Sequence, residues 1–330
     1  MKLGVNTYFL HFLEFEEGLR FAKDHGAQAL EVALLGEPSL KYCDMEKLLA
    51  DRDALRRWLD TLAEHGLEIS GFTAHGEPLS SDPDVVKAYS DCFQKVCRLA
   101  EAAGAPRLIV LSGIPAGAPG DVCPTWIVDS FPLENRRTLR WQWEERLIPF
   151  WREHGKIAED HGCTVCVEPQ IGQLVHSPTT MARLREAVGP VIGCNFDPSH
   201  LFVQQIDVLE AIRFLGDAIH HVHVKDTRFF PHNLRLKGLL DNTNYTKPED
   251  RSWNFTLIGW GHDQIFWRDF VSTLRFIGYE GALSVEMESN YINVKEGLEK
   301  SFAFLKPLLL KEPIGTTWSE YSGLDLSTED

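Results

Sequence analysis

The feature that most constrains the fold of this chain is an eightfold alternation of short apolar runs with amphipathic segments. The apolar runs predict strands at residues 3–9, 29–34, 67–74, 107–114, 164–168, 191–196, 219–224 and 282–286. The segments between them have apolar residues at helical spacing and predict helices at residues 15–26, 45–66, 84–104, 135–162, 178–189, 208–216, 266–278 and 294–310. The strands are almost continuously apolar, which is typical of parallel strands covered by helices.

Eight strand and helix pairs predict a single (β/α)8 TIM barrel, and the 330 residues suffice for one. An open dinucleotide-binding sheet is disfavoured, because residues 7–12 after the first strand contain no glycine and so lack its phosphate-binding fingerprint. We therefore expect residues 1–311 to form the barrel and the polar residues 312–330 to form a C-terminal tail.

Residues 227–264 interrupt the alternation as a long polar insertion between the seventh strand and the seventh helix. Long loops in compact domains usually have a function. Loops that follow barrel strands lie at the carboxyl-terminal end of the barrel, where TIM-barrel enzymes hold their active sites. We expect this insertion to cover that end as a lid.

Composition limits the partners of the chain. The net charge of −15 repels the phosphate backbone of nucleic acids, so we expect no nucleic-acid partner. The apolar runs are far shorter than the ~20 residues of a membrane span. The N-terminus turns polar too early for a secretory signal, and we expect a cytoplasmic protein. Whether the chain forms a homo-oligomer stays open.

Four successive strands end in residues that commonly bind metals. Glu168 ends the fifth strand, Asp197 follows the sixth, His223 lies near the end of the seventh and Glu286 ends the eighth. Each of these residues alone would more often be a solvated or packed side chain. Carboxylates and an imidazole that converge from successive strands suit one divalent ion, either Mn²⁺, Co²⁺, Mg²⁺ or Zn²⁺. The sequence therefore predicts a metal site at the barrel mouth.

Further polar residues follow other strands. His200 lies three residues after Asp197 and has two interpretations, a contact to metal or substrate and a helix-capping histidine. His75 follows the third strand, where it would either bind substrate or cap the next helix. Glu31, on the second strand, is a further candidate without an assigned role.

The order of these residues resembles the xylose isomerase-like TIM-barrel superfamily of sugar phosphate isomerases and epimerases. The resemblance rests on Glu168, on the segments Asp197-Pro198-Ser199-His200 and His221-Val222-His223-Val224-Lys225-Asp226, and on Glu286. It implies that Glu168, Asp197, His223 and Glu286 bind the metal and that His200 lies near metal or substrate. It also implies a substrate-binding role for Lys225 and Asp226, and Arg228 is the nearest match to the arginine of ketohexose epimerases. Gln170 stands where many relatives have a histidine.

The insertion carries a second likeness. Its segment Gly259-Trp260-Gly261-His262-Asp263 resembles a subgroup of glycoside-catabolic enzymes that act on 3-keto sugars or 3-keto-glycosides. This likeness implies substrate contacts from Trp260 and His262. A plain turn with an exposed tryptophan is the alternative.

These features predict a metal-dependent sugar isomerase or epimerase that transfers a proton next to a carbonyl through an enediolate. Glu168 and Glu286 would act on opposite faces of the substrate carbon. The alternative is a metal-dependent lyase or dehydratase that performs β-elimination on a 3-keto sugar or 3-keto-glycoside, because both reactions begin with the same proton abstraction. An endonuclease IV-like enzyme and a non-catalytic sugar-binding barrel are less favoured, the former because of the negative charge.

Overall fold

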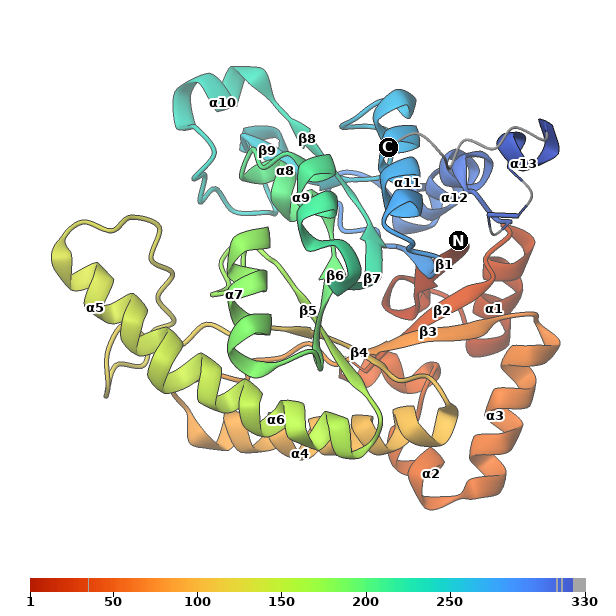
Figure 1. Ribbon diagram of the computed structural model, residues 1–330, viewed down its shortest axis with the longest axis horizontal. Coiled ribbons are helices and arrows are strands. Elements are labelled where there is room, and N and C mark those ends of the chain that lie inside the picture. Colours follow the sequence, from red (N-terminus) through yellow and green to blue (C-terminus); the bar gives the residue numbers. More distant parts are fainter. Residues whose placement is uncertain (35, 313, 316, 323–330) are drawn as a thin grey trace.

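The computed structural model describes residues 1–34, 36–312, 314–315 and 317–322. Eight parallel strands close into a barrel in the order β1-β10-β7-β6-β5-β4-β3-β2, which confirms the predicted (β/α)8 fold (Figure 1). The barrel strands are β1 (Lys2–Asn6), β2 (Ala29–Ala33), β3 (Glu68–Thr73), β4 (Arg107–Leu111), β5 (Thr164–Glu168), β6 (Ile192–Phe196), β7 (Ile219–Val224) and β10 (Ala282–Val285). Part of the expected tail, residues 313, 316 and 323–330, lies outside the described residues.

Helices surround the barrel, and several begin at capping residues that the sequence displays. The helices are α1 (Phe15–Asp24), α2 (Met45–Ala50), α3 (Arg52–Glu64), α4 (Pro83–Ala103), α5 (Leu133–Trp141), α6 (Ile148–Asp160), α7 (Pro178–Val188), α8 (Pro198–Val203), α9 (Val208–Leu215), α10 (Pro231–Lys237), α11 (Gln264–Phe276), α12 (Val294–Leu305) and α13 (Trp318–Ser322). Helix α4, for example, has an Asp82 side chain that accepts the N–H of Asp84, and Pro83 occupies its first turn. Gly104 ends it in a left-handed conformation with φ 67°.

Several predicted elements differ from the structure at their boundaries, and in two of them a capping side chain is the cause. The single helix predicted at residues 45–66 is broken into α2 and α3, because Asp51 is extended and its carboxylate caps α3 by accepting the N–H groups of Asp53 and Ala54. The first strand ends at Asn6 instead of residue 9, and residues 7–10 form a 3-10 helix that the Asn6 side chain caps. Side-chain hydrogen bonds to the backbone thus set both boundaries.

The apolar core lies mainly between the strands and the helices. Large side chains such as Phe93, Trp151 and Trp267 are fully buried there. The inside of the barrel is polar instead, with Glu31, Asn195, His221 and other hydrogen-bonding groups buried along its axis. The outer layer therefore supplies most of the hydrophobic stabilisation, while the interior presents chemical groups.

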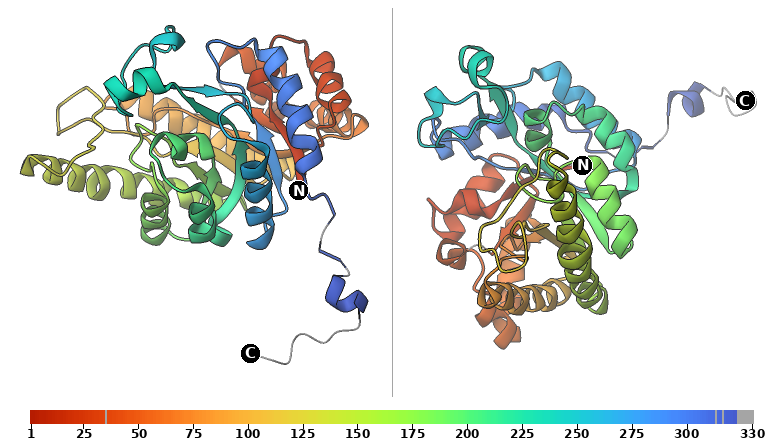
Figure 2. Two further views of the ribbon diagram at one scale, coloured as in Figure 1. Left: turned by 90° about the horizontal axis from the view of Figure 1, so that it is seen from above. Right: turned by 90° about the vertical axis from the view of Figure 1, so that its left-hand side faces the viewer.

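The insertion after β7 forms a small antiparallel sheet of β8 (Asp226–Phe229) and β9 (Trp253–Thr256), with α10 between the two strands. In Figure 1 it rises beyond the carboxyl-terminal ends of β6 and β7, and Figure 2 shows it from two further sides. Trp253 and Phe255 of β9 pack against Val203 at the end of α8. The insertion thus contacts the mouth side of the barrel through α8.

Among the residues that the structure describes, no helix has both the length and the apolar character needed to cross a bilayer.

Candidate metal and substrate site

Buried polar side chains fill the carboxyl-terminal end of the barrel. Glu168, Asp197, His223 and Glu286, the four predicted metal ligands, are all buried there. They point inward because alternate residues of a strand share a face, as His221, His223 and Lys225 do around the end of β7. The barrel therefore brings together side chains that lie more than 100 residues apart in the sequence.

His223 lies at the centre of the cluster. Its Nδ1 atom is 2.9 Å from Glu168 Oε2 and 3.4 Å from Glu286 Oε2. Its Nε2 atom lies 2.9 Å from Glu31 Oε2 on the other side of the ring. Two carboxylates from strands that are not neighbours thus converge on the Nδ1 atom of one imidazole. A third carboxylate, at the Nε2 atom, fixes the orientation of the ring.

Asp197 and His200 complete the cluster. The Oδ1 atom of Asp197 accepts the N–H of Ser199 and caps α8, while its buried Oδ2 atom has no hydrogen bond and lies 3.0 Å from Lys225 Nζ. His200 Nε2 lies 3.2 Å from Glu168 Oε1 and 3.6 Å from Asp197 Oδ2, again without hydrogen-bond geometry. Buried polar atoms that lack hydrogen bonds are rare, and an ion is one explanation for them.

The donor set fits a divalent metal ion. Ligand atoms of Asp197, His223 and Glu286 lie within 4.8 Å of one another, as do those of Glu168, Asp197 and His200. Two ligands on opposite sides of one ion, each bonded at ~2.0 to 2.2 Å, are about 4 Å apart. The two groups share Asp197, and their oxygen and imidazole donors suit Mn²⁺, Co²⁺, Mg²⁺ or Zn²⁺.

The charges of the cluster also favour a cation. Glu31, Glu168, Asp197 and Glu286 are four buried carboxylates. The His223 ring pairs with Glu31 and Glu168, and the buried ammonium of Lys225 faces Asp197 and Glu286. Lys225 Nζ lies 3.0 Å from Asp197 Oδ2 and 2.9 Å from Glu286 Oε2, and it also contacts Glu288 at 3.0 Å. Because burying an unpaired carboxylate is costly, the remaining negative charge would be stabilised by a bound divalent ion.

The pKa values show the strength of these interactions. Burial alone would raise the pKa of Glu31, but the charge and hydrogen bond of His223 hold that pKa at about 2. Burial raises the pKa of Glu286 to about 7. Burial would lower the pKa of Lys225, yet Asp197 and Glu286 raise it well above its ordinary value. The carboxylate and ammonium charges of the cluster therefore depend on one another.

A shell of neutral groups holds the cluster, and the sequence analysis did not find it. Asn195 Nδ2 donates to Glu168 Oε2 at 2.7 Å, and His221 Nδ1 donates to Asn195 Oδ1 at 2.9 Å. Asn195 precedes Asp197 by two residues on a buried strand, so strand alternation is the signal that would have placed both on the same face.

A further set of buried hydrogen bonds converges on Glu31. Its carboxylate accepts hydrogen bonds from Asn6 Nδ2 at 2.9 Å, Ser284 Oγ at 2.6 Å and the Thr73 hydroxyl, in addition to His223. These four partners lie on four different strands, β1, β10, β3 and β7. The partners of Glu31 indicate the role that the sequence left unassigned. Glu31 fixes the His223 ring at its Nε2 atom, while the Nδ1 atom faces Glu168 and Glu286.

The other predicted substrate residues divide into two groups. Lys225 lies within the cluster, and His75 follows β3 at the same barrel end, where its Nε2 atom is buried without a hydrogen-bond partner. Asp226 instead has its oxygens occupied by the chain, because it accepts the N–H groups of Gly259, Gly261 and His262 and the His262 ring.

Trp260, His262 and Arg228 lie outside the cluster. The Trp260 ring lies 5.4 Å from Lys300 Nζ of α12, and the His262 ring stacks on Phe202 of α8 with a centroid separation of 3.7 Å. Arg228 is exposed on β8. The structure thus places Trp260 beside a helix and Arg228 in solvent, while the His262 ring contacts Asp226 and none of the four predicted metal ligands.

Phe255 of the insertion contacts the cluster and lines a cavity at the mouth. Its ring is 5.1 Å from the His200 ring, and Lys225 Nζ lies 4.9 Å from its centroid. The cavity that Phe255 lines has a volume of about 600 Å³, with Tyr8, Phe12, Tyr245 and Glu288 among its walls. Pockets for small molecules have volumes of about 300–1,000 Å³, so this cavity is large enough for one.

Comparisons with known proteins agree with this architecture. The uncharacterized protein YfiH of Bacillus subtilis (strain 168) is 36% identical over 310 residues, which are 93% of this chain and 98% of YfiH. The probable 3-DHS dehydratase AsbF of Bacillus anthracis superposes with a TM-score of 0.65 at 16% identity, over 93% of this chain and 99% of AsbF. At this identity the likeness to solved structures concerns the fold.

Two further solved structures share the fold. The 3-keto-D-glucoside 4-epimerase YcjR of E. coli has a TM-score of 0.63 at 14% identity, over 93% of this chain and 99% of YcjR. IolI, whose crystal structure has a binding zinc atom, has a TM-score of 0.62 at 17% identity, over 94% and 99% of the two chains. The sequence model of one family, described as xylose isomerase-like TIM barrel, matches residues 19–308. The chain therefore belongs to the xylose isomerase-like TIM barrel family.

Proposed function

We propose that this protein is a divalent-metal-dependent sugar isomerase or epimerase that transfers a proton at a carbon next to a carbonyl. One observation carries the proposal: Glu168 and Glu286 approach the same nitrogen of His223 from β5 and from the end of β10, which β6 and β7 separate. Two carboxylates so placed can face a substrate carbon from two sides. One would remove its proton and the other would return a proton to the opposite face.

Glu168, Asp197, His223 and Glu286 would hold the metal, with His200 beside them. When bound, the ion would polarise the substrate carbonyl and stabilise the negative charge that forms as the proton leaves. Asn195 positions Glu168 by a hydrogen bond, and Lys225 positions Glu286 by an ion pair. Both carboxylates are thus fixed in place before substrate arrives, which lowers the cost of reaching the reactive geometry.

The insertion would exclude water from this chemistry. Phe255 lies against His200 and Lys225. Asp226, at the start of β8, accepts the N–H groups of Gly259 and His262 and so fixes the turn that follows β9. A closed, dry site suppresses side reactions of an enediolate. We therefore retain the lid role for residues 227–264 as part of the proposal.

A β-elimination on a 3-keto sugar or 3-keto-glycoside is the second candidate. The cavity of about 600 Å³ beside Phe255 favours it, because it leaves room for a group attached to a sugar ring. The probable 3-DHS dehydratase AsbF and the 3-keto-D-glucoside 4-epimerase YcjR share the fold. Both candidates begin with the same removal of a proton next to a carbonyl, so they differ in what happens to the resulting enediolate.

The test is solvent deuterium exchange. The protein is stripped of metal, then supplied with Mn²⁺, Co²⁺, Mg²⁺ or Zn²⁺ and incubated in D₂O with ketohexoses, their phosphates and 3-keto-glucosides. Proton NMR is expected to show that the signal of the proton next to the carbonyl disappears, as deuterium replaces it, with at least one substrate. An epimerised product supports the first candidate, and a dehydrated or cleaved product supports the second.

Matched variants make the test specific. Glu168→Gln and Glu286→Gln should abolish exchange while the proteins remain folded by circular dichroism. Glu68→Gln, which changes an exposed carboxylate of β3 that pairs with Lys2, should exchange at the wild-type rate. Exchange that continues without added metal, or in both site variants, would contradict the proposal.

A further inference from the structure

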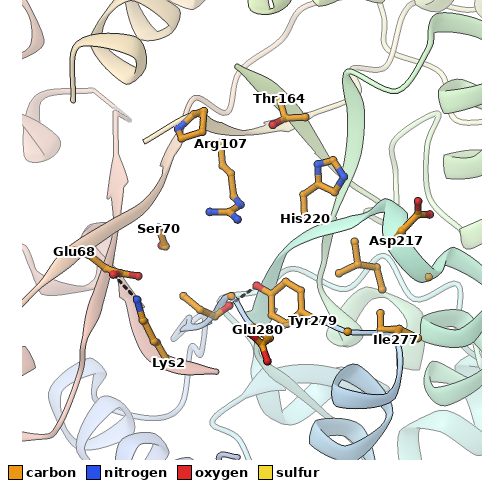
Figure 3. Close-up of a pocket in the computed structure, with 16 residues that line it drawn as sticks. Lys2, Glu68, Ser70, Arg107, Thr164, Asp217, His220, Ile277, Tyr279 and Glu280 are labelled. Carbon is orange, nitrogen blue, oxygen red and sulfur yellow. Dashed lines mark hydrogen bonds and ion pairs between the residues drawn. The ribbon is translucent and has the colours of Figure 1, made fainter. Parts of the chain in front are cut away.

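A second cavity is drawn in Figure 3, and its lining strand residues lie at the ends of the barrel strands opposite to those that carry the metal cluster. Its volume is about 630 Å³. Its lining residues come from the amino-terminal ends of strands: Lys2 of β1, Glu68 of β3, Arg107 of β4, Thr164 of β5, His220 of β7 and Ala282 of β10. The proposed metal reaction uses none of these residues.

Arg107 is the unusual group in this cavity. Its side chain extends into the space between Ser70, His220 and Tyr279 (Figure 3). Arg107 is only partly exposed. Its guanidinium forms no hydrogen bond or ion pair with any residue in the described ranges 1–34 and 36–312. A guanidinium has five N–H donors, so that of Arg107 has all five available for a ligand that enters the cavity.

The carboxylates around the cavity form no ion pair with Arg107 among the described residues. Glu68 pairs with Lys2, and Glu280 pairs with Arg275 at 3.3 Å. Asp217 is exposed at the rim and forms no ion pair among the described residues. Arg107 is therefore the positive charge in this lining that is free to bind a ligand, because Lys2 is already paired.

Ser70 separates this cavity from the metal cluster. Ser70 lines the cavity, and its Oγ atom lies 3.3 Å from His221 Nε2 inside the barrel. His221 in turn contacts Asn195, which holds Glu168. The two sites are thus at opposite ends of one polar interior and do not share a lining residue.

We propose that this cavity binds a small oxyanion, the phosphate or carboxylate group of a metabolite, with Arg107 as its anchor. The planar guanidinium matches the two oxygens of a carboxylate or phosphate with parallel hydrogen bonds. The Thr164 side chain faces the same cavity and offers a hydroxyl to an oxygen of the ligand. The volume is that of a small-molecule pocket, which suits a compact anion better than a peptide or a nucleic acid.

The experiment measures anion binding to the metal-free protein. Inorganic phosphate and succinate are titrated separately into the protein by calorimetry, and thermal unfolding is followed at constant ionic strength set with chloride. We expect at least one anion to release heat with saturation and to raise the melting temperature above the chloride value. Binding of phosphate alone identifies a phosphate-bearing ligand, and binding of succinate identifies a carboxylate.

Arg107→Met should lose both the heat and the rise in melting temperature, because it keeps much of the apolar stem and removes the charge. Arg98→Met is the matched control, since Arg98 is an exposed arginine of α4 outside the cavity, and it should bind like the wild type. If Arg107→Met does not fold, Arg107→Lys and Thr164→Val, which remove the guanidinium fork and the hydroxyl, should each weaken binding severalfold. The absence of binding to the wild type, or unchanged binding in the Arg107 and Thr164 variants, would overturn the proposal.

Discussion

Replacing Glu31 by glutamine tests whether the carboxylate behind His223 organises the barrel interior. All four of its partners, Asn6, Thr73, His223 and Ser284, direct a donor at it. An amide keeps the shape but turns one acceptor oxygen into an NH₂ group, so that donors would face donors. The variant therefore breaks buried hydrogen bonds and removes the charge that stabilises His223.

The size of the effect follows from two arguments. Breaking a buried ion pair by removing one partner costs about 3–5 kcal/mol. A buried carboxyl whose pKa falls on folding from its ordinary 4.5 to about 2 is stabilised in its charged form by roughly 3 kcal/mol. We therefore expect Glu31→Gln to lower the free energy of unfolding by about 3–5 kcal/mol.

The assay is urea denaturation of metal-free protein, followed by tryptophan fluorescence and by circular dichroism. Glu68→Gln provides the control, because it makes the same chemical change in an exposed ion pair with Lys2, where a loss of ~0–1 kcal/mol is expected. Similar losses for the two variants, within about 1 kcal/mol of each other, would refute the view that Glu31 organises the interior.

Three further predictions follow from the site. Asp197→Asn should weaken Mn²⁺ binding at least tenfold by calorimetry, whereas Asp207→Asn, at the cap of α9, should not; equal affinities would remove Asp197 from the ligand set. Phe255→Leu should slow turnover about tenfold by admitting water but change unfolding free energy by only ~1–2 kcal/mol; unchanged turnover would count against the lid. Asp226→Ala should free the turn at residues 259–262, so trypsin should cleave the insertion faster while Mn²⁺ affinity stays the same; unchanged cleavage would show that other contacts hold the insertion.

Periodicity predicted the barrel because it depends on residues close in sequence. The spacing of apolar side chains indicates helices and strands. The carboxyl ends of the parallel strands of a barrel lie at the same end of it, irrespective of the loops that connect them. The convergence of Glu168, Asp197, His223 and Glu286 followed from strand position alone. The break between α2 and α3 was missed because Asp51 acts there through a local hydrogen bond to the backbone, which leaves the apolar spacing unchanged.

The supporting groups were harder to predict because their roles depend on contacts between distant strands. Nothing near Asn195 in the sequence indicates that its amide reaches Glu168, and nothing near Ser284 indicates that its hydroxyl reaches Glu31. The resemblance implies a substrate-binding role for Asp226, and nothing in the sequence indicates that the turn at residues 259–262 donates hydrogen bonds to its carboxylate. The approach of one segment to a distant one, as of this turn to Asp226, is determined by tertiary packing.

The arrangement around Glu31 also bears on how the barrel can be divided. Of its partners, Asn6 and Thr73 belong to the first four barrel strands, whereas His223 and Ser284 belong to the last four. A half-barrel fragment made of the first four strands would bury this carboxylate with only half of its donors, and the complementary fragment would bury the Nε2 atom of His223 without the carboxylate that faces it. The two halves would therefore be poor independent folding units, and closure of β10 against β1 would have to occur in the same cooperative step that satisfies the interior.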